Sequence, residues 1–257
     1  MKGRIFSVVG GMFLLTVCGK GEQSQVQAAP PAIDPAPASA SSSAGGTITG
    51  KVKFTGTAPR GRPIDMSEEA ACKAKYTTPP TDESVVAGAA NALSNVFVYV
   101  SAGVPAGQTF TAPATPVVLD QDGCRYRPHV FGVMVGQAVE IRNSDPVLHN
   151  IKAVAKRNRP FNVSQPNAGM KMTRTFAQPE VMVNLECNVH GWMKAYAGVR
   201  PDPFFAVSGP DGSFTIKDLP PGTYTIEAWH EKFGTQTATV TIAGTESKTA
   251  NFTFAAR

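Results

Sequence analysis

The sequence is poor in charged residues, histidine and tryptophan. Only 17% of its 257 residues are charged, and it holds four histidines and two tryptophans. The net charge of +5 falls to +3 (22 basic against 19 acidic residues) if Lys2 and Arg4 leave with an amino-terminal leader. This charge is mild, and no basic run is interleaved with aromatic residues. We therefore expect no nucleic-acid partner.

Several motifs of catalysis and cofactor attachment are missing. No Gly-x-Ser-x-Gly elbow is present, which argues against a serine hydrolase. No two histidines have His-x-His spacing, and four histidines are too few for multicopper oxidase chemistry. Haem attachment needs Cys-x-x-Cys-His, whereas "CNVHG" (187–191) has one cysteine. Structural zinc needs four Cys or His ligands, usually in paired spacings. We expect no enzyme.

Long apolar runs are absent after the first residues of the chain. "IFSVVGGMFLLTV" (5–17) follows a short positive region, which is typical of an export signal and too short to span a bilayer. "LLTVCG" resembles a lipoprotein box that would lipidate Cys18, although Val17 stands where that pattern has a small residue. Cleavage after Ala28 is the alternative. Either reading predicts export to the bacterial periplasm or cell surface, with a lipid anchor in the first case.

Residues 19–45 contain almost no large apolar side chain. Pro, Ala and Ser dominate this stretch, which cannot bury enough surface to become ordered. We predict a flexible tether between the leader (1–18) and a folded region.

Cysteine is scarce, and its count is informative. Of four cysteines, three remain if Cys18 is lipidated, an odd number for an exported protein. Cys72 and Cys124 both lie in polar, loop-like contexts, and a disulfide between them suits an oxidising compartment. Cys187 is then left over. A free thiol in the periplasm needs to be buried or bound to a metal.

Glycine and proline are plentiful, and alternation of apolar and polar residues dominates from residue 47 on. No helical period of useful length occurs, although "SEEAACKAKY" (67–76) could form two turns. The pattern predicts an all-β protein built as sandwiches. The clearest strands are expected over 47–54, 95–100, 130–135, 138–143, 181–187, 193–199 and 224–230.

The stretch "CNVHGWM" (187–193) joins two of these strands. Val181, Val183, Leu185 and Cys187 share one face of the first strand, and Met193 begins the inward face of the second. A thiolate, an imidazole and a thioether thus converge on one short loop. A mononuclear electron-transfer copper site requires a thiolate, two imidazoles and a weak axial thioether.

The second imidazole must come from another strand end. His149 follows the strand over 138–143 and lies in a loop with Asp145 and Pro146. His129 and His230 have no ligand-like neighbours, and we interpret them as ordinary surface or strand histidines.

"RYRPHVFGVMVGQAVEIRNSDPVLHN" (125–150) and "KMTRTFAQPEVMVNLECNVHGWM" (171–193) resemble the cupredoxin family, over about residues 117–200. The resemblance implies one type 1 copper ion. The implied copper ligands are His149, Cys187, His190 and Met193. The resemblance also implies that the Asn150 side chain steadies the Cys187 loop. Electrons would leave through the edge of His190, where Gly191 and Trp192 help to form a contact patch. Gln178-Pro179-Glu180 departs from the family's usual Pro-Gly at that turn.

"GGTITGKVKFTGTAP" (45–59) and "GPDGSFTIKDLPPGTYTIEAWHEKFGTQTATVTI" (209–242) resemble the carboxypeptidase regulatory-like (transthyretin-like) sandwich. The two resemblances imply two Greek-key sandwiches, one nested in the other, as in exported bacterial proteins of the methylamine-utilisation type. The parts are 46–112 and 203–257 for the regulatory-like sandwich, and 113–202 for the cupredoxin-like one.

Three functions follow as hypotheses. The first is a one-electron carrier at the periplasmic membrane that exchanges electrons with other periplasmic redox proteins. The second is a metal-free surface adhesion or carbohydrate-binding module, in which Cys187 is a buried inert thiol. The third is a copper storage or delivery protein.

Overall fold

The computed structural model describes residues 45–256. The predicted export segment, Cys18 and the tether up to residue 44 lie outside the described residues. Within the described range the chain is almost wholly β, with seventeen strands, one single-turn α-helix and one 3-10 turn. The predicted all-β class is therefore confirmed. The "SEEAACKAKY" stretch forms one turn, α1 (Ala70–Lys73), and the 3-10 turn is η1 (Ala89–Asn91).

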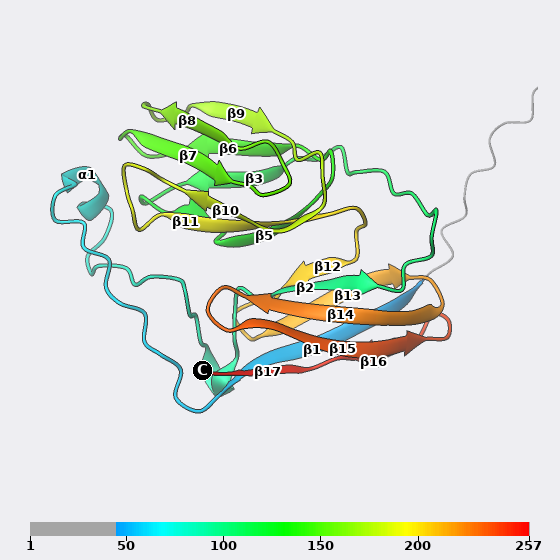
Figure 1. Ribbon diagram of the computed structural model, residues 1–257. Coiled ribbons are helices and arrows are strands. Elements are labelled where there is room, and N and C mark those ends of the chain that lie inside the picture. Colours follow the sequence, from blue (N-terminus) through cyan, green and yellow to red (C-terminus); the bar gives the residue numbers. More distant parts are fainter. Residues whose placement is uncertain (1–44, 257) are drawn as a thin grey trace, which may run out of the picture. The chain divides into compact units, whose positions relative to one another are not determined.

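One sandwich, the outer sandwich, is formed by strands from both ends of the described chain (Figure 1). One of its sheets has the order β13-β1-β16, with β17 also paired to β1, and the other has the order β12-β2-β14-β15. Its strands are β1 (Gly46–Thr55), β2 (Phe97–Ala102), β12 (Phe205–Val207), β13 (Ser213–Leu219), β14 (Gly222–His230), β15 (Gly234–Ile242), β16 (Ser247–Thr249) and β17 (Phe252–Ala255).

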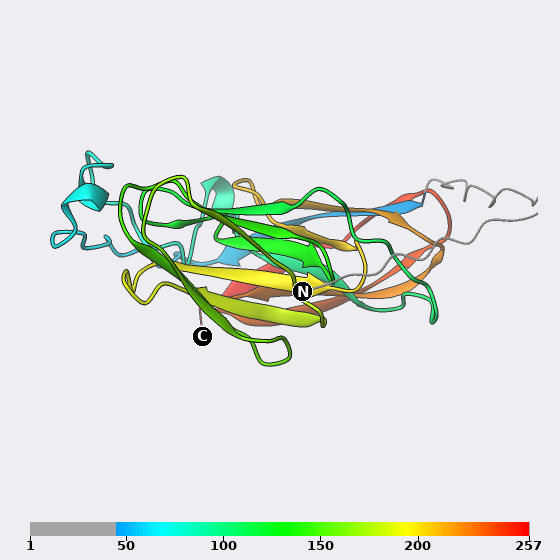
Figure 2. The same ribbon diagram turned by 90° about the horizontal axis from the view of Figure 1, so that it is seen from above.

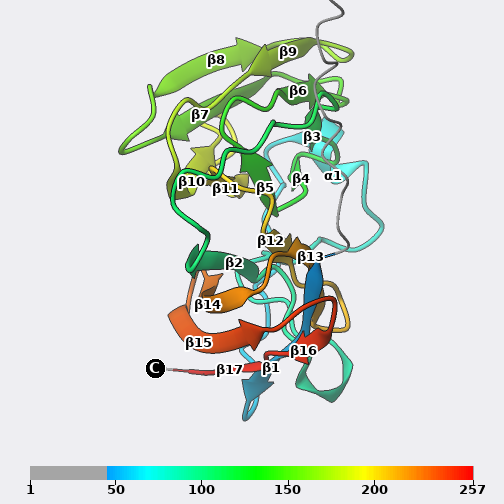
Figure 3. The ribbon, with the colours of Figure 1, turned by 90° about the vertical axis from the view of Figure 1, so that its right-hand side faces the viewer.

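The second sandwich, the inserted sandwich, comprises β3 to β11 and lies between β2 and β12 in the sequence. Its sheets have the orders β5-β11-β10-β7-β8 and β4-β3-β6-β9, which Figure 3 shows from the side. Its strands are β3 (Val117–Gln121), β4 (Tyr126–Arg127), β5 (Val130–Met134), β6 (Val139–Asn143), β7 (His149–Val154), β8 (Phe161–Gln165), β9 (Lys171–Arg174), β10 (Glu180–Glu186) and β11 (Lys194–Arg200).

Alternation along the strands produces a separate core in each sandwich. Ile48, Val52 and Phe54 of β1 are all buried, as the period-two pattern predicted. Their side chains join the apolar residues of β14 in one hydrophobic cluster. A second cluster fills the inserted sandwich and includes Cys187 and Met193. Both residues therefore point into the core, as predicted.

The inward face of β10 differs from the prediction at its start. Val183 and Leu185 are buried, but Val181 is 37% exposed, and Glu180 is buried in its place. The pairing of β10 with β11 is irregular between Glu180 and Val183, which shifts the alternation. The buried Glu180 carboxylate accepts hydrogen bonds from the backbone N–H groups of residues 156–158. These N–H groups need an acceptor, and this requirement overrides the apolar pattern of the strand.

Residues 62–82, which we call the cover, pack with the core of the inserted sandwich. The sequence analysis assigned them to the first part of the regulatory-like sandwich, yet Ile64, Met66 and Cys72 belong to the other cluster. Figures 1 and 2 show α1, which lies within the cover, at one end of the inserted sandwich. The sequence signal failed because the cover has no strand period of its own.

None of the helices formed by residues 45–256 has the length and hydropathy that a membrane span requires.

Close contacts between β2, β5 and β11 depend on glycine. Gly132 of β5 and Gly198 of β11 lie opposite each other in parallel register. A Cβ atom added at Gly198 would lie 2.3 Å from the Phe97 ring, and one at Gly132 would lie 2.9 Å from the same ring. The Phe97 ring from β2 thus occupies the space beside Gly198, and the Phe205 ring from β12, 2.2 Å from a Cβ added at Gly132, fills most of the space beside Gly132.

We predict that Gly198→Ala lowers the free energy of unfolding by about 1–3 kcal/mol, because the added methyl group overpacks the contact with Phe97. Denaturant unfolding of the full chain measures this change. Gly244→Ala is the matched control, because a Cβ there meets no atom within 4 Å. Equal losses from both variants would contradict the packing argument.

Candidate metal centre

A tight turn after β10 positions three side chains predicted as ligands. The Cys187 N–H donates to the Met193 carbonyl at 3.3 Å, and the Met193 N–H donates to the His190 carbonyl at 2.9 Å. The His190 N–H donates to the Cys187 sulfur at 3.3 Å. These bonds fold residues 187–193 back on themselves, so the thiol and the imidazole of one short loop face the same point.

His149 reaches that point from a different strand. It is the first residue of β7, where it pairs with Gln165 of β8. Because β7 also pairs with β10, the start of β7 and the end of β10 lie at the same end of the sheet. The sheet register therefore brings together residues that are 38 or more positions apart in the sequence.

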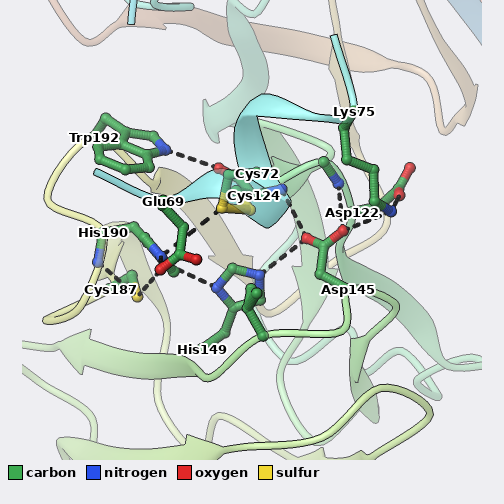
Figure 4. Close-up of a disulfide and its surroundings, with 12 residues drawn as sticks. Glu69, Cys72, Lys75, Asp122, Cys124, Asp145, His149, Cys187, His190 and Trp192 are labelled. Carbon is green, nitrogen blue, oxygen red and sulfur yellow. Dashed lines mark hydrogen bonds and ion pairs between the residues drawn. A yellow bond between two sulfur atoms is a disulfide. The ribbon is translucent and has the colours of Figure 1, made fainter. Parts of the chain in front are cut away.

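The three side chains converge in the interior (Figure 4). The Nδ1 atoms of His149 and His190 are 3.0 Å apart, and the Cys187 sulfur is 3.9 Å from the His190 Nδ1. One ligand atom from each of the three residues lies within 4.8 Å of the others. His149, Cys187 and His190 are only 0%, 4% and 2% exposed. Two ring nitrogens and a thiol thus form a compact, dry donor set.

Met193, the fourth predicted ligand, is buried at the end of the same turn with 1% exposure. The contacts that tie it to Cys187 and His190 are made by its backbone. The other two histidines do not belong to the cluster. His129 bonds to Glu231 and to the Lys194 carbonyl, and is buried rather than at the surface. His230 stacks on Phe233.

Asp145 orients His149, a role that the sequence analysis did not assign. The His149 Nε2 donates to the Asp145 carboxylate at 2.9 Å, so Nδ1 is the ring nitrogen that faces the cluster. The carboxylate also accepts the N–H groups of Gly123 and Cys124 and pairs with Lys75 at 2.8 Å.

These contacts shift the pKa of both partners. Burial alone would raise the pKa of Asp145, but its bonds from His149, Lys75 and two backbone N–H groups hold the pKa well below its usual range. Burial alone would lower the pKa of His149, but the bonds to Asp145 and Cys187 outweigh it and raise the pKa. The carboxylate therefore remains charged beside the ring that it orients.

The Cys187 thiol is poised as a thiolate. Burial alone would raise its pKa, but hydrogen bonds from His149, His190 and two backbone N–H groups lower the pKa to about 5. A thiolate is the form that ligates metals. The Asn150 side-chain oxygen accepts the N–H of Asn188 at 3.0 Å, so this amide holds the loop next to Cys187.

The edge of His190 is covered, in contrast to the open exit patch implied by the resemblance. Its Nε2 lies 3.9 Å from the Cys72 sulfur and 3.6 Å from a Glu69 carboxylate oxygen. Cys72 is joined to Cys124 by a disulfide. Gly191 is exposed, but the Trp192 ring is half-buried and donates its N–H to the Cys124 carbonyl. The cover therefore separates His190 from solvent.

The sequence contains a weak indication of the contact between Asp145 and His149. Asp145 lies four residues before His149 in a loop, a spacing from which an orienting contact could have been suspected. Lys75 and Glu69 carried no such signal, because both lie more than 60 residues before their partners. Their roles depend on how the cover folds back.

One part of the chain matches a known protein family. Residues 199–255 match the family model of the carboxypeptidase regulatory-like domain, which confirms the resemblance of the carboxy-terminal flank. No curated protein is significantly similar to this chain in sequence.

Solved structures similar to the chain include copper proteins. A Cu-containing nitrite reductase from Thermus scotoductus SA-01 is 23% identical with a TM-score of 0.33, covering 40% of this chain and 26% of that one. A purple cupredoxin from Nitrosopumilus maritimus is 21% identical with a TM-score of 0.28, covering 32% of this chain and 98% of that one. An amicyanin mutant is 21% identical with a TM-score of 0.31, covering 46% and 93%. Because these TM-scores are low, the case for a metal centre rests on the side chains themselves.

We predict that Asp145→Asn lowers the free energy of unfolding by roughly 2–4 kcal/mol near neutral pH, because the amide cannot replace a buried, multiply bonded carboxylate. The pKa of Asp145 is lowered in the fold, so its contribution is present above the ordinary carboxyl pKa and is lost as the pH falls through the folded value. The difference between variant and parent should therefore shrink only below about pH 4.

Denaturant unfolding at a series of pH values measures this difference. Asp218→Asn is the matched control, because Asp218 is exposed. A loss for Asp145→Asn that is independent of pH down to the strongly acidic range would contradict the proposed charge effect.

Proposed function

We propose that this protein binds a single copper ion in a mononuclear type 1 site and acts as a one-electron carrier. The observation that carries the proposal is the convergence of two imidazole Nδ1 atoms and a thiol of lowered pKa at a buried position. A thiolate with two imidazoles is the donor set of electron-transfer copper sites, with a thioether as weak axial ligand. His149, Cys187 and His190 would hold the ion, with Met193 on the axis.

Bound copper would supply a redox centre that gains and loses one electron. The protein's own part is to keep the donors still. Asp145 fixes the ring of His149, the Asn150 amide holds the loop beside Cys187, and the disulfide packs against His190. Donors that are held in this way cannot rearrange to suit one oxidation state, so little must move when the electron does.

The burial of the donors favours a carrier over an enzyme. None of the three ligand residues has more than 4% of its surface exposed, so a substrate has no direct approach to the centre. Electron transfer requires no such contact. The same enclosure disfavours storage or delivery, because these functions need ready exchange of copper. The convergence of three metal-binding donors disfavours a metal-free adhesion module, because adhesion does not require them.

The leader and the disulfide support an extracytoplasmic location. We propose that the protein is exported, is held at the membrane through lipidated Cys18, and exchanges electrons with periplasmic redox proteins. A disulfide suits an oxidising compartment of this kind.

We expect one equivalent of Cu(II) to give an intense thiolate-to-copper band in the visible spectrum and an EPR signal of a type 1 site. Cys187→Ser should abolish the band, because the thiolate provides the transition. His129→Gln is the matched control and should leave the band unchanged, since His129 lies outside the cluster.

Three results would contradict the proposal. Stoichiometric copper without a thiolate band would exclude a type 1 site. A protein that binds no copper would favour the adhesion or carbohydrate-binding alternative. Rapid exchange of Cu(I) with no reversible oxidation would favour storage or delivery.

A further inference from the structure

The cover is a loop whose two ends lie side by side. Pro63 and Thr81 form an isolated β-bridge, and the Ile64 N–H donates to the Pro80 carbonyl at 2.8 Å. The Asp82 N–H donates to the Arg62 carbonyl at 2.9 Å. A loop with closed ends can move away from the body of the protein while its neck remains in place. The residues between the ends can therefore act as one unit.

The cover lies across one side of the three converging donors. Cys72 and Glu69 are the cover residues that approach the His190 Nε2, at 3.9 and 3.6 Å (Figure 4). Away from the cover, His149, Cys187 and Met193 are almost completely buried, and Cys187 and Met193 belong to the core cluster of the inserted sandwich. Movement of the cover is thus the shortest way to bring the donors into contact with water.

A surface hollow lies between the cover and the ligand loop. It has a volume of about 330 Å³ and is lined by Met66 and Glu69 of the cover and by Val189, His190 and Trp192 of the ligand loop. The hollow reaches His190 from the outer side, yet the ring remains only 2% exposed. A small displacement of the cover would extend the hollow to the donor atoms.

The cover is attached to the inserted sandwich by one disulfide and a small number of polar contacts. The Cys72–Cys124 disulfide spans 52 residues. The Tyr76 hydroxyl donates to the Gly123 carbonyl at 2.7 Å, and Lys75 pairs with Asp145 at 2.8 Å. Within the described chain the disulfide is the only covalent cross-link. Noncovalent contacts of this kind open locally at modest cost, whereas a disulfide does not.

We propose that the cover is the gate through which the metal enters and leaves the centre, and that the Cys72–Cys124 disulfide keeps this gate shut. The proposal deepens the proposed function, on which it rests for the identity of the metal. A closed disulfide then makes the centre a permanent redox site, and its absence makes the centre open to metal exchange.

The first test measures access to Cys187 in the metal-free full chain. A small alkylating reagent is added, and the modified Cys187 peptide is followed by mass spectrometry. The double variant Cys72→Ser, Cys124→Ser should react at least about tenfold faster than the parent, because the opening of the cover no longer meets a covalent constraint. Equal rates would overturn the gate.

Three further variants separate opening of the gate from general loss of stability. Gly198→Ala weakens packing far from the cover in the sequence and should leave the Cys187 alkylation rate at that of the parent. Lys75→Met keeps the disulfide, removes the ion pair to Asp145 and should cause a smaller increase. Lys73→Met, at an exposed lysine two residues earlier, should cause none. If Gly198→Ala accelerates alkylation as much as the double variant, access follows global unfolding and the gate is wrong.

The second test measures release of copper from the loaded full chain to a competing Cu(I) chelator. Release from the double variant should be at least about tenfold faster than from the parent. Unchanged release with unchanged alkylation overturns the gate but leaves the copper proposal intact. Failure of both proteins to bind copper overturns the copper proposal, while the alkylation rates still decide whether the cover is a gate.

Discussion

The hydrogen bond between the buried Asp145 carboxylate and His149 is the contact on which the arrangement of the centre depends. That carboxylate accepts donors from the 123–124 backbone and from His149, and it pairs with Lys75 of the cover. A buried charge is tolerated only when it is paired and hydrogen-bonded, so these segments must all be in place together. Three features therefore depend on one another through this carboxylate: the orientation of the His149 ring, the position of the cover and the shape of the 123–124 loop.

The sequence predicted those features that follow from local pattern. Alternation placed Cys187 and Met193 toward the core, and the odd cysteine count singled out Cys187. The resemblance to cupredoxins added His149. The prediction from sequence failed where the contact that decides the structure joins residues distant in sequence. Glu180 replaced Val181 in the interior because backbone N–H groups at 156–158 required an acceptor. The covering of His190 depends on a segment more than 100 residues earlier, about which no local pattern gives information.

The two sandwiches are connected in a way that makes the insertion mechanically simple. β2 and β12 precede and follow the inserted residues, and they pair directly, with Phe205 opposite Tyr99. The chain therefore leaves and re-enters the outer sandwich at neighbouring positions, which is the condition under which an inserted domain is tolerated. Arg200, at the end of the last inserted strand, donates to the Val100 carbonyl and so ties the re-entry point to β2.

If the centre carries electrons as proposed, the burial of His190 beneath the disulfide also bears on the energetics of electron exchange. An imidazole open to solvent is surrounded by water dipoles that must turn whenever the charge of the centre changes. Here its outer nitrogen meets a sulfur atom and a carboxylate whose positions are already set. A centre enclosed in this way requires little solvent reorientation, and the shell that excludes water also sets the local dielectric. A partner would then approach only as far as the outer surface of the cover, so the thickness of that segment becomes part of the tunnelling distance.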